Sequence, residues 1–289
     1  MTDLSRAELE SPARGVVHVW LIDLRRAESE AHSSGEKTRL ESERDVRVEW
    51  RIRAGRRSRE ILARYLGCSP ELVPIERGEH GKPSLGAGER ADLSYSLSHS
   101  GDFALMAVSK GRRVGVDLER VRPTARGGAL AARFFSPQEA DAIGVLSDRV
   151  RLEAFFRTWV RNEAYIKGLG GSVPSGLRRC EIVVDRAGIP QILSSRLEPT
   201  ETSRWSIRDL EAPPGYVAAL ATEGDVERIV PLQGQTARPS GTTQVSFTSQ
   251  ASAPHRRDWC TSPEPSRSSK TFRSRPRSRT LAHFMLPLS

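Results

Sequence analysis

The sequence predicts an α/β (α+β) fold made of two similar halves with a cleft between them. A strand, a long helical segment and further strands follow one another before residue 112, and a similar order of elements recurs after it. Short runs rich in β-branched residues are typical of buried strands, and apolar residues at helical spacing indicate helices. The halves share no detectable sequence repeat, so their similarity rests on the order of elements alone.

The N-terminal half is expected to contain a charged helical segment among three strands. The segment covers residues 41–66 and is expected to form one or two helices that end near Gly67, since glycine often follows the last helical residue. Residues 78–88 are expected to form a loop, and residues 98–102 a turn between strands. The expected strands are 16–24, 93–97 and 103–109.

The C-terminal half is expected to be organised around a second long helix at residues 150–169. A shorter helix before it has a capping-box pattern, in which Ser136 precedes Pro137 at the first helical position and Glu139 follows three residues after the serine. The other expected elements are a helix at 129–133, the capped helix at 137–145, and strands at 113–118, 180–184, 205–210 and 216–222.

Charge and composition divide the chain further. From residue 233 onward there are nine Lys/Arg but only two acidic residues, a net of +7 out of +9 for the whole chain. This Ser/Thr/Pro/Arg-rich stretch has no apolar period and is predicted to be disordered. The expected divisions are a flexible leader at 1–15, an N-terminal half at 16–112, a C-terminal half carrying the metal site at 113–232, and a disordered basic tail at 233–289.

Cysteine spacing and hydropathy argue for a soluble cytoplasmic protein. The three cysteines, Cys68, Cys180 and Cys260, are far apart and odd in number, so neither a zinc site nor a disulfide framework is expected. The first apolar run, residues 16–22, is too short to span a membrane. A basic chain can bind nucleic acid, but no motif here supports specific recognition.

Three carboxylates and a lysine are the candidate chemical groups. Asp117 and Glu119 are two residues apart on an expected strand and so share one face. Glu163 and Lys167 share one face of the long helix with Trp159. Taken separately, these acids could be a solvated strand end and an ordinary surface Glu–Lys pair. Together, three carboxylates provide the oxygen ligands that Mg²⁺ prefers. A protein-bound Mg²⁺ often also binds substrate phosphates, and Lys167 could contact those phosphates.

Two loops add weaker candidates for phosphate contact. His99 lies between Ser98 and Ser100 in the expected turn and has no acidic partner at a telling spacing, so a hydrolase triad has little support. Its alternatives are a structural role or contact with a phosphate. Lys82 lies between a glycine and a proline, where it could be a solvated side chain or a fixed cation. No P-loop or dinucleotide-binding glycine motif is present.

Five segments, taken in order, resemble the Sfp-type 4′-phosphopantetheinyl transferases over roughly residues 16–222. Each is short, and their order and spacing carry the resemblance. They are Gly81-Lys82-Pro83; Ser96-Leu97-Ser98-His99-Ser100; Val114-Gly115-Val116-Asp117-Leu118-Glu119; Phe134-Phe135-Ser136-Pro137-Gln138-Glu139; and Phe156-Arg157-Thr158-Trp159-Val160-Arg161-Asn162-Glu163-Ala164-Tyr165-Ile166-Lys167.

The resemblance implies a pseudo-twofold monomer with coenzyme A bound in the cleft. It implies an enzyme that moves the phosphopantetheine arm of coenzyme A onto a serine of an acyl or peptidyl carrier protein, releasing adenosine 3′,5′-bisphosphate. The implied roles are Mg²⁺ ligation by Asp117, Glu119 and Glu163; catalysis by Glu163, Lys167 and Glu119; and coenzyme binding by Arg51, Lys82, Ser98, His99 and Lys167.

The chain departs from the family pattern at two places. The family often has a lysine directly before the metal-binding glutamate, and this chain has Asn162. A long basic tail such as 233–289 is also rare in the family. A non-catalytic coenzyme A- or carrier-binding module of the same fold is the alternative function. Which carrier and which pathway (fatty acid, polyketide or nonribosomal peptide) are served does not follow from the sequence.

Overall fold

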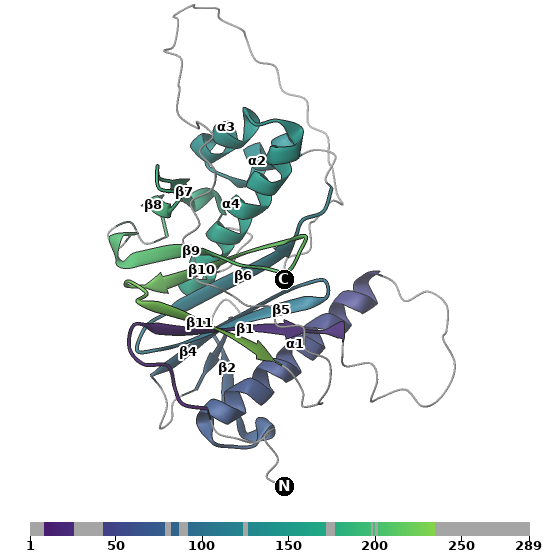
Figure 1. Cartoon of the computed structure of the whole chain (residues 1–289), viewed down its shortest axis with the longest axis vertical. Helices are drawn as coiled ribbons and strands as arrows, with labels where there is room; N and C mark the ends of the chain where they lie inside the picture. Colours follow the sequence, from purple (N-terminus) through teal and green to yellow (C-terminus); the bar gives the residue numbers. More distant parts are fainter. Residues whose placement is uncertain are drawn as a thin grey trace, which may run out of the picture.

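The computed structural model describes residues 9–25, 43–78, 82–86, 92–123, 127–171, 177–197, 199 and 202–234. The expected leader is therefore described only from residue 9, and the expected tail only as far as residue 234. Two sheets lie at the centre of the molecule, with the long helices α1 (Glu43–Leu66) and α4 (Asp148–Gly168) on either side of them (Figure 1). The predicted mixed α/β architecture of two sheet-and-helix units is thus confirmed.

The first sheet has the strand order β11-β1-β5-β4. These strands are β1 (Val16–Asp23), β4 (Leu93–Ser100), β5 (Phe103–Lys110) and β11 (Arg228–Gly234). Because side chains alternate along a strand, β1 supplies both faces of the sheet. Trp20 and Ile22 pack with Leu62 and Tyr65 of α1, whereas Val17 and Val19 face the second sheet.

The second sheet has the order β6-β10-β9 and lies between the first sheet and α4. Its strands are β6 (Val114–Arg120), β9 (Trp205–Leu210) and β10 (Tyr216–Glu223). On β10, Leu220 belongs to the core shared with the first sheet, while Ala219 and Ala221 pack in the core that contains α4. The layers are therefore α1, sheet, sheet and α4.

Smaller elements complete the two halves. The capping box predicted for α3 is confirmed, because the Ser136 side chain accepts from the Glu139 amide and the Glu139 side chain accepts from the Ser136 amide. The strand predicted at residues 180–184 is confirmed, whereas its hairpin partner and the short hairpin before residue 86 were not predicted. The smaller elements are two hairpins and two short helices. The hairpins are β2 (Ile75–Arg77) with β3 (Pro83–Leu85) and β7 (Cys180–Val184) with β8 (Pro190–Ser195), and the helices are α2 (Gly127–Phe134) and α3 (Pro137–Gly144).

Two differences from the expected boundaries concern the first sheet. Strand β4 continues through Ser98 and Ser100, so these residues lie on a strand and the turn is confined to Gly101 and Asp102. Gly101 has a φ of +55°, which allows so tight a reversal. At the other end of the chain, β11 extends to Gly234 and pairs in parallel with β1. The last strand therefore crosses the expected 232/233 boundary and belongs to the sheet of the N-terminal half.

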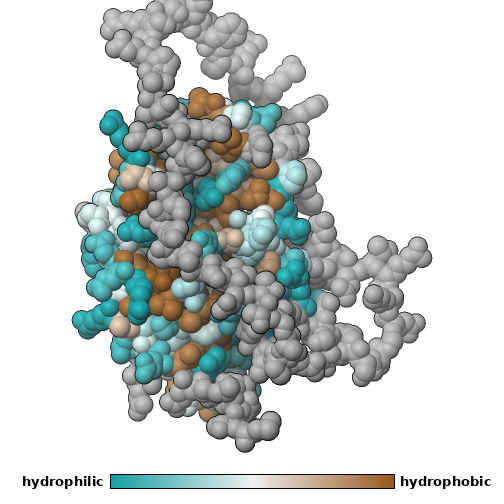
Figure 2. Space-filling model, viewed as in Figure 1, coloured by the Kyte–Doolittle hydropathy of each residue, from teal (hydrophilic) through white to brown (hydrophobic). Residues whose placement is uncertain are grey.

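The exposed apolar side chains of the described residues are scattered over the surface. Figure 2 shows apolar residues on one face in separate patches bordered by hydrophilic residues. Large exposed apolar side chains come from separate elements, among them Ile52, Leu72, Val145 and Leu193. Within the described part of the chain, no helix has the length and apolar character needed to cross a membrane.

Candidate active site

The carboxylates of β6 are directed toward the serines of β4, the facing edge strand of the other sheet. Asp117 is fully buried, and its Oδ1 accepts a hydrogen bond of 2.6 Å from Ser98 Oγ. Two residues further along each strand, Glu119 Oε2 accepts a bond of 2.7 Å from Ser100 Oγ. The two acids therefore share the face between the halves and are not a solvated strand end.

Helix α4 brings a third carboxylate and an ammonium group to the same place. Lys167 Nζ lies 2.6 Å from Asp117 Oδ1, 3.1 Å from Ser98 Oγ and 3.5 Å from Glu163 Oε2. Glu163 is only 1% exposed, which excludes an ordinary surface ion pair with Lys167. Because Asp117 and Glu163 contact the same ammonium, the strand and helix segments predicted to act together do converge.

Burial and mutual repulsion perturb the ionisation of this cluster. Burial, followed by the charge of Asp117, raises the pKa of Glu119 to about 7 and raises the pKa of Glu163 well above its ordinary value. Burial alone would lower the pKa of Lys167, but Asp117 and Glu163 raise it above its usual range. The raised pKa values of the two glutamates show that like charge is crowded in a buried place, and a bound cation would relieve this crowding.

The oxygens of the cluster fit a hard divalent cation. Asp117 Oδ2 and Glu163 Oε2 are buried and have no hydrogen-bond partner among the described residues. Buried carboxylate oxygens are costly unless a cation or a donor meets them, and Mg²⁺ prefers such ligands. In the described ranges no three His, Cys, Asp or Glu side chains form a ready-made metal cluster, and the Lys167 ammonium lies 2.6 Å from Asp117 and 3.5 Å from Glu163. The donor set therefore suits Mg²⁺.

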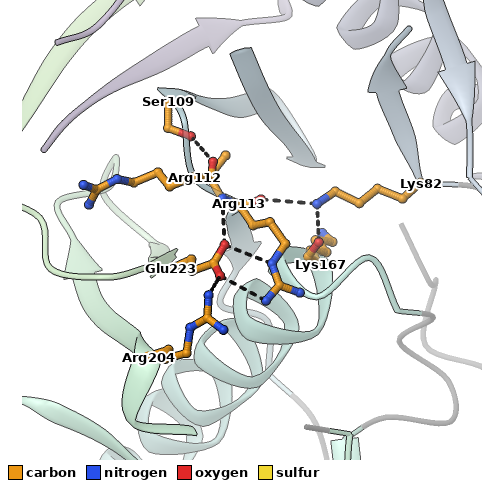
Figure 3. A network of polar contacts seen from close by, with 8 residues as sticks. Lys82, Ser109, Arg112, Arg113, Lys167, Arg204 and Glu223 are labelled. Atoms are coloured by element: carbon orange, nitrogen blue, oxygen red, sulfur yellow. Dashed lines mark hydrogen bonds and ion pairs between the residues drawn. The ribbon is translucent and has the colours of Figure 1, made fainter. Parts of the chain in front are cut away.

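The predicted coenzyme-binding residues lie around Lys167. Burial, followed by the charges of Lys167 and Arg51, lowers the pKa of His99 to about 4, so His99 is neutral at neutral pH. Lys82 Nζ donates to the Val114 carbonyl oxygen at 3.2 Å and to the Lys167 carbonyl oxygen, as Figure 3 shows. Burial, and then the Lys167 charge, lowers the pKa of Lys82 to about 8. Arg51 is exposed on α1.

An arginine network beside Lys82 was not predicted. The Arg113 guanidinium lies 3.1 Å from Glu223 Oε2 (Figure 3). It also lies 5.0 Å from the centre of the Trp205 ring. Arg204 binds the same glutamate at 2.7 Å. The network fixes the start of β6 against β10, and the charge of Arg113 contributes to the lowered pKa of Lys82. Two consecutive arginines directly before the carboxylate strand were the available sequence signal.

Asn162 faces away from the carboxylate cluster. It is fully buried, and its Nδ2 donates to Glu139 Oε1 at 2.8 Å, while Cys180 Sγ donates to its Oδ1 at 2.9 Å. The neighbouring Arg161 is bound to Asp209 through two bonds of 2.8 and 2.6 Å. An asparagine at 162 therefore ties α4 to α3 and β7, and it removes no charge from the side of the helix that carries Glu163 and Lys167.

Comparison with known proteins gives one family. The model of the 4′-phosphopantetheinyl transferase superfamily matches residues 113–221, the range that contains Asp117, Glu119, Glu163 and Lys167. The 4′-phosphopantetheinyl transferase HetI of Nostoc sp. (strain PCC 7120) is 35% identical over 222 residues, covering 72% of this chain and 88% of HetI. The 4′-phosphopantetheinyl transferase AcpT of Salmonella typhimurium is 40% identical over 114 residues, which is 39% of this chain and 57% of AcpT.

Among solved structures, the holo-[acyl-carrier-protein] synthase of Neisseria meningitidis matches 38% of this chain and 95% of its own length, at 18% identity and a TM-score of 0.33. The family assignment rests on the similarity to HetI, because that match spans most of both chains. This assignment agrees with the order of the five sequence motifs and with the convergence of their residues between the two sheets. The chain belongs to the 4′-phosphopantetheinyl transferases.

Proposed function

We propose that Asp117, Glu119 and Glu163 bind one Mg²⁺ and, with Lys167, the diphosphate of coenzyme A. The enzyme moves the phosphopantetheine arm of coenzyme A onto a serine of a carrier protein. The observation that supports the site is the contact of Lys167 with both Asp117 and Glu163 in a buried place between the sheets. When bound there, Mg²⁺ would offset the charge that develops on the transferred phosphoryl group.

Charge and position suggest which residues around the proposed metal site bind the phosphates of coenzyme A. Lys167 is fixed by two carboxylates and by Ser98, so it presents a cation that needs no reorganisation during the reaction. Ser98, neutral His99 and Lys82 are proposed to contact the phosphates of coenzyme A, with Arg51 at the outer end. The Lys82 ammonium uses two protons on backbone carbonyls and has a third for a phosphate oxygen.

The proposed chemistry is a single displacement at the β-phosphorus of coenzyme A. The carrier serine oxygen forms a bond to this phosphorus, and the bond from the phosphorus to the bridging oxygen breaks. Adenosine 3′,5′-bisphosphate leaves with the electron pair, and the serine proton passes to Glu163 or Glu119. Both carboxylates lie on the face where β4, β6 and α4 meet, so either one is placed to accept it.

The proposal also covers how the carrier protein docks, the oligomeric state and the location of the enzyme. Carrier proteins are acidic around their modified serine, and the exposed arginines of α1, such as Arg51 and Arg56, could steer them toward the site. We propose a cytoplasmic monomer with no specific nucleic-acid partner and no membrane attachment. A coenzyme A- or carrier-binding module without chemistry remains the alternative function.

The function is tested by incubating the full chain with coenzyme A and either an apo acyl carrier or an apo peptidyl carrier protein. With Mg²⁺, intact-protein mass spectrometry should show the mass of one phosphopantetheine arm on at least one carrier. EDTA should abolish the gain and added Mg²⁺ should restore it. Transfer that persists in EDTA would refute the metal assignment, and coenzyme A binding with no mass gain on either carrier would favour the binding module.

The lowered pKa of Lys82 predicts how coenzyme binding depends on pH. Because Lys82 loses its proton as pH rises through about 8, its attraction for phosphate is present below that pH and is lost above it. Calorimetry with adenosine 3′,5′-bisphosphate should show affinity falling by about tenfold between roughly pH 7 and pH 9. Lys82→Met should bind weakly and lose this pH dependence, whereas Lys110→Met, on an exposed lysine of β5, should keep it. An identical slope in Lys82→Met would remove Lys82 from the phosphate site.

A further inference from the structure

Strands β4 and β6 belong to different sheets, yet serine hydroxyls connect them. Ser96 Oγ accepts a hydrogen bond of 3.1 Å from the Val116 amide, and Ser100 Oγ accepts one of 3.1 Å from the Arg120 amide. The two contacts are four residues apart on each strand, so the strands run parallel and in register at this junction. The serine hydroxyls take the place that carbonyl acceptors would have in a regular ladder.

Ser100 differs from Ser96 because its hydroxyl also contacts a carboxylate. Its proton is donated to Glu119 Oε2 at 2.7 Å, while the oxygen accepts from the Arg120 amide. A hydroxyl has one proton, and an amide N–H can only donate. The Arg120 amide therefore fixes the orientation in which the Ser100 proton points at Glu119. Ser96 makes the same kind of amide contact, but among the described residues its hydroxyl forms no hydrogen bond with a carboxylate.

The position of Ser100 is itself held firmly. It is the last residue of β4 and only 6% exposed. The turn that follows is joined to the other sheet, because the Asp102 amide donates to Tyr216 Oη at 3.2 Å. A Cβ on Gly101 would lie 2.8 Å from that same oxygen, so the turn and β10 are in close contact. Ser100 thus contacts Glu119 from a place that the fold fixes on both sides.

We infer that Ser100 is a positioning residue, which holds the Glu119 carboxylate on the face where Asp117 and Glu163 converge. The inference deepens the proposed function and rests on it, since it concerns one of the three proposed Mg²⁺ ligands. Ser98 is a different case, because it contacts Asp117 and Lys167 and belongs to the phosphate site already described. Without the Ser100 proton, Glu119 is free to rotate away from the shared face.

The test compares Ser100→Ala with Ser96→Ala, using Mn²⁺ as the probe for the metal site. Hydrogen-bond partners of metal ligands commonly alter metal affinity or activity by about 10–100-fold when removed. Ser100→Ala should therefore weaken Mn²⁺ binding, measured by electron paramagnetic resonance, by about 10–100-fold and lower kcat to a similar extent. The KM for coenzyme A should change by less than about twofold, because the phosphate contacts remain. Ser100→Thr, which keeps the hydroxyl, should restore both values.

Ser96→Ala is the matched control, because it removes an equally buried hydroxyl from the same strand and frees one amide of β6. It should lower the melting temperature about as much as Ser100→Ala and leave Mn²⁺ affinity unchanged. Equal loss of Mn²⁺ affinity in both variants, or none in Ser100→Ala, would overturn the inference. Should Ser100→Ala fail to fold, Ser100→Cys replaces it with the same expectations. Failure of the wild-type protein to bind Mn²⁺ would instead refute the metal site itself.

Discussion

Glu163→Gln should abolish carrier modification while leaving the protein folded. The substitution preserves the shape of a side chain that is 1% exposed, but it removes a negative oxygen from the proposed metal site and one of two candidate proton acceptors. Loss of general base catalysis alone typically lowers rates by about 10²–10⁴-fold. Intact-protein mass spectrometry should therefore show at least about a 10³-fold slower gain of the phosphopantetheine mass.

The stability of the same variant should not fall. The folded-state pKa of Glu163 is raised by burial and by Asp117, so between its unfolded pKa and its folded pKa the folded state binds more protons. Stability consequently decreases as pH rises through that window, so the buried Glu163 carboxyl costs stability that an uncharged side chain of the same shape would not. Glutamine removes this cost, and the melting temperature should stay equal or rise. Full transfer activity in Glu163→Gln would disprove the proposed roles of Glu163 as metal ligand and proton acceptor.

Glu153→Gln is the matched control for this experiment. Glu153 lies on the same helix but is exposed, and it forms an ion pair of 2.8 Å with Arg157. Exposed pairs of this kind contribute about 0.3–0.5 kcal/mol. The control should therefore keep both its activity and its melting temperature. A similar loss of activity in both variants would mean that the effect comes from α4 as a whole.

Elements with strong local patterns could be predicted from sequence, and those that depend on distant partners could not. Helix α4 carries apolar residues at helical spacing, and α3 begins with a complete capping box. By contrast, β11 contains Pro231, and its residues 228–233 are exposed or only partly buried. It is a strand because β1 offers an edge to pair with. Pairing between residues some 200 positions apart leaves no local signal.

The same distinction applies to the site. Spacing placed Asp117 and Glu119 on one face of β6, and Glu163 and Lys167 on one face of α4, which is local geometry. That the two faces meet required the resemblance to a family or a structure. Ser98–Ser100 read as a turn because serine, glycine and aspartate are common in turns, yet the facing amides and carboxylates of β6 stabilise a strand there. Contacts with residues of α3 and β7 likewise determine the role of Asn162.

Gly115→Ala should disrupt the approach of α4 to β6 and with it the active site. A Cβ at Gly115 would overlap the Ala164 carbonyl oxygen and the Gly168 amide nitrogen, and would lie 2.9 Å from Gly168 Cα. These are backbone atoms, so no side-chain rotation relieves the overlap, and α4 must move away from the strand. Overpacking of this kind costs about 1–3 kcal/mol or more. Urea unfolding should show a loss of at least about 2 kcal/mol.

The effect on catalysis should exceed the effect on folding. Ala164 and Gly168 flank Glu163 and Lys167, so displacing this stretch of α4 separates those side chains from Asp117, and a misplacement of about 1 Å can cost 10²-fold in rate. Transfer per folded molecule should therefore fall by about 10²-fold or more, measured where the variant is folded. Gly55→Ala is the control, since nothing lies within 4 Å of a Cβ there, in the middle of α1. It should stabilise the helix by about 0.5–1 kcal/mol and keep full activity. If Gly115→Ala retained wild-type activity, the close contact of α4 with β6 would not be what assembles the site.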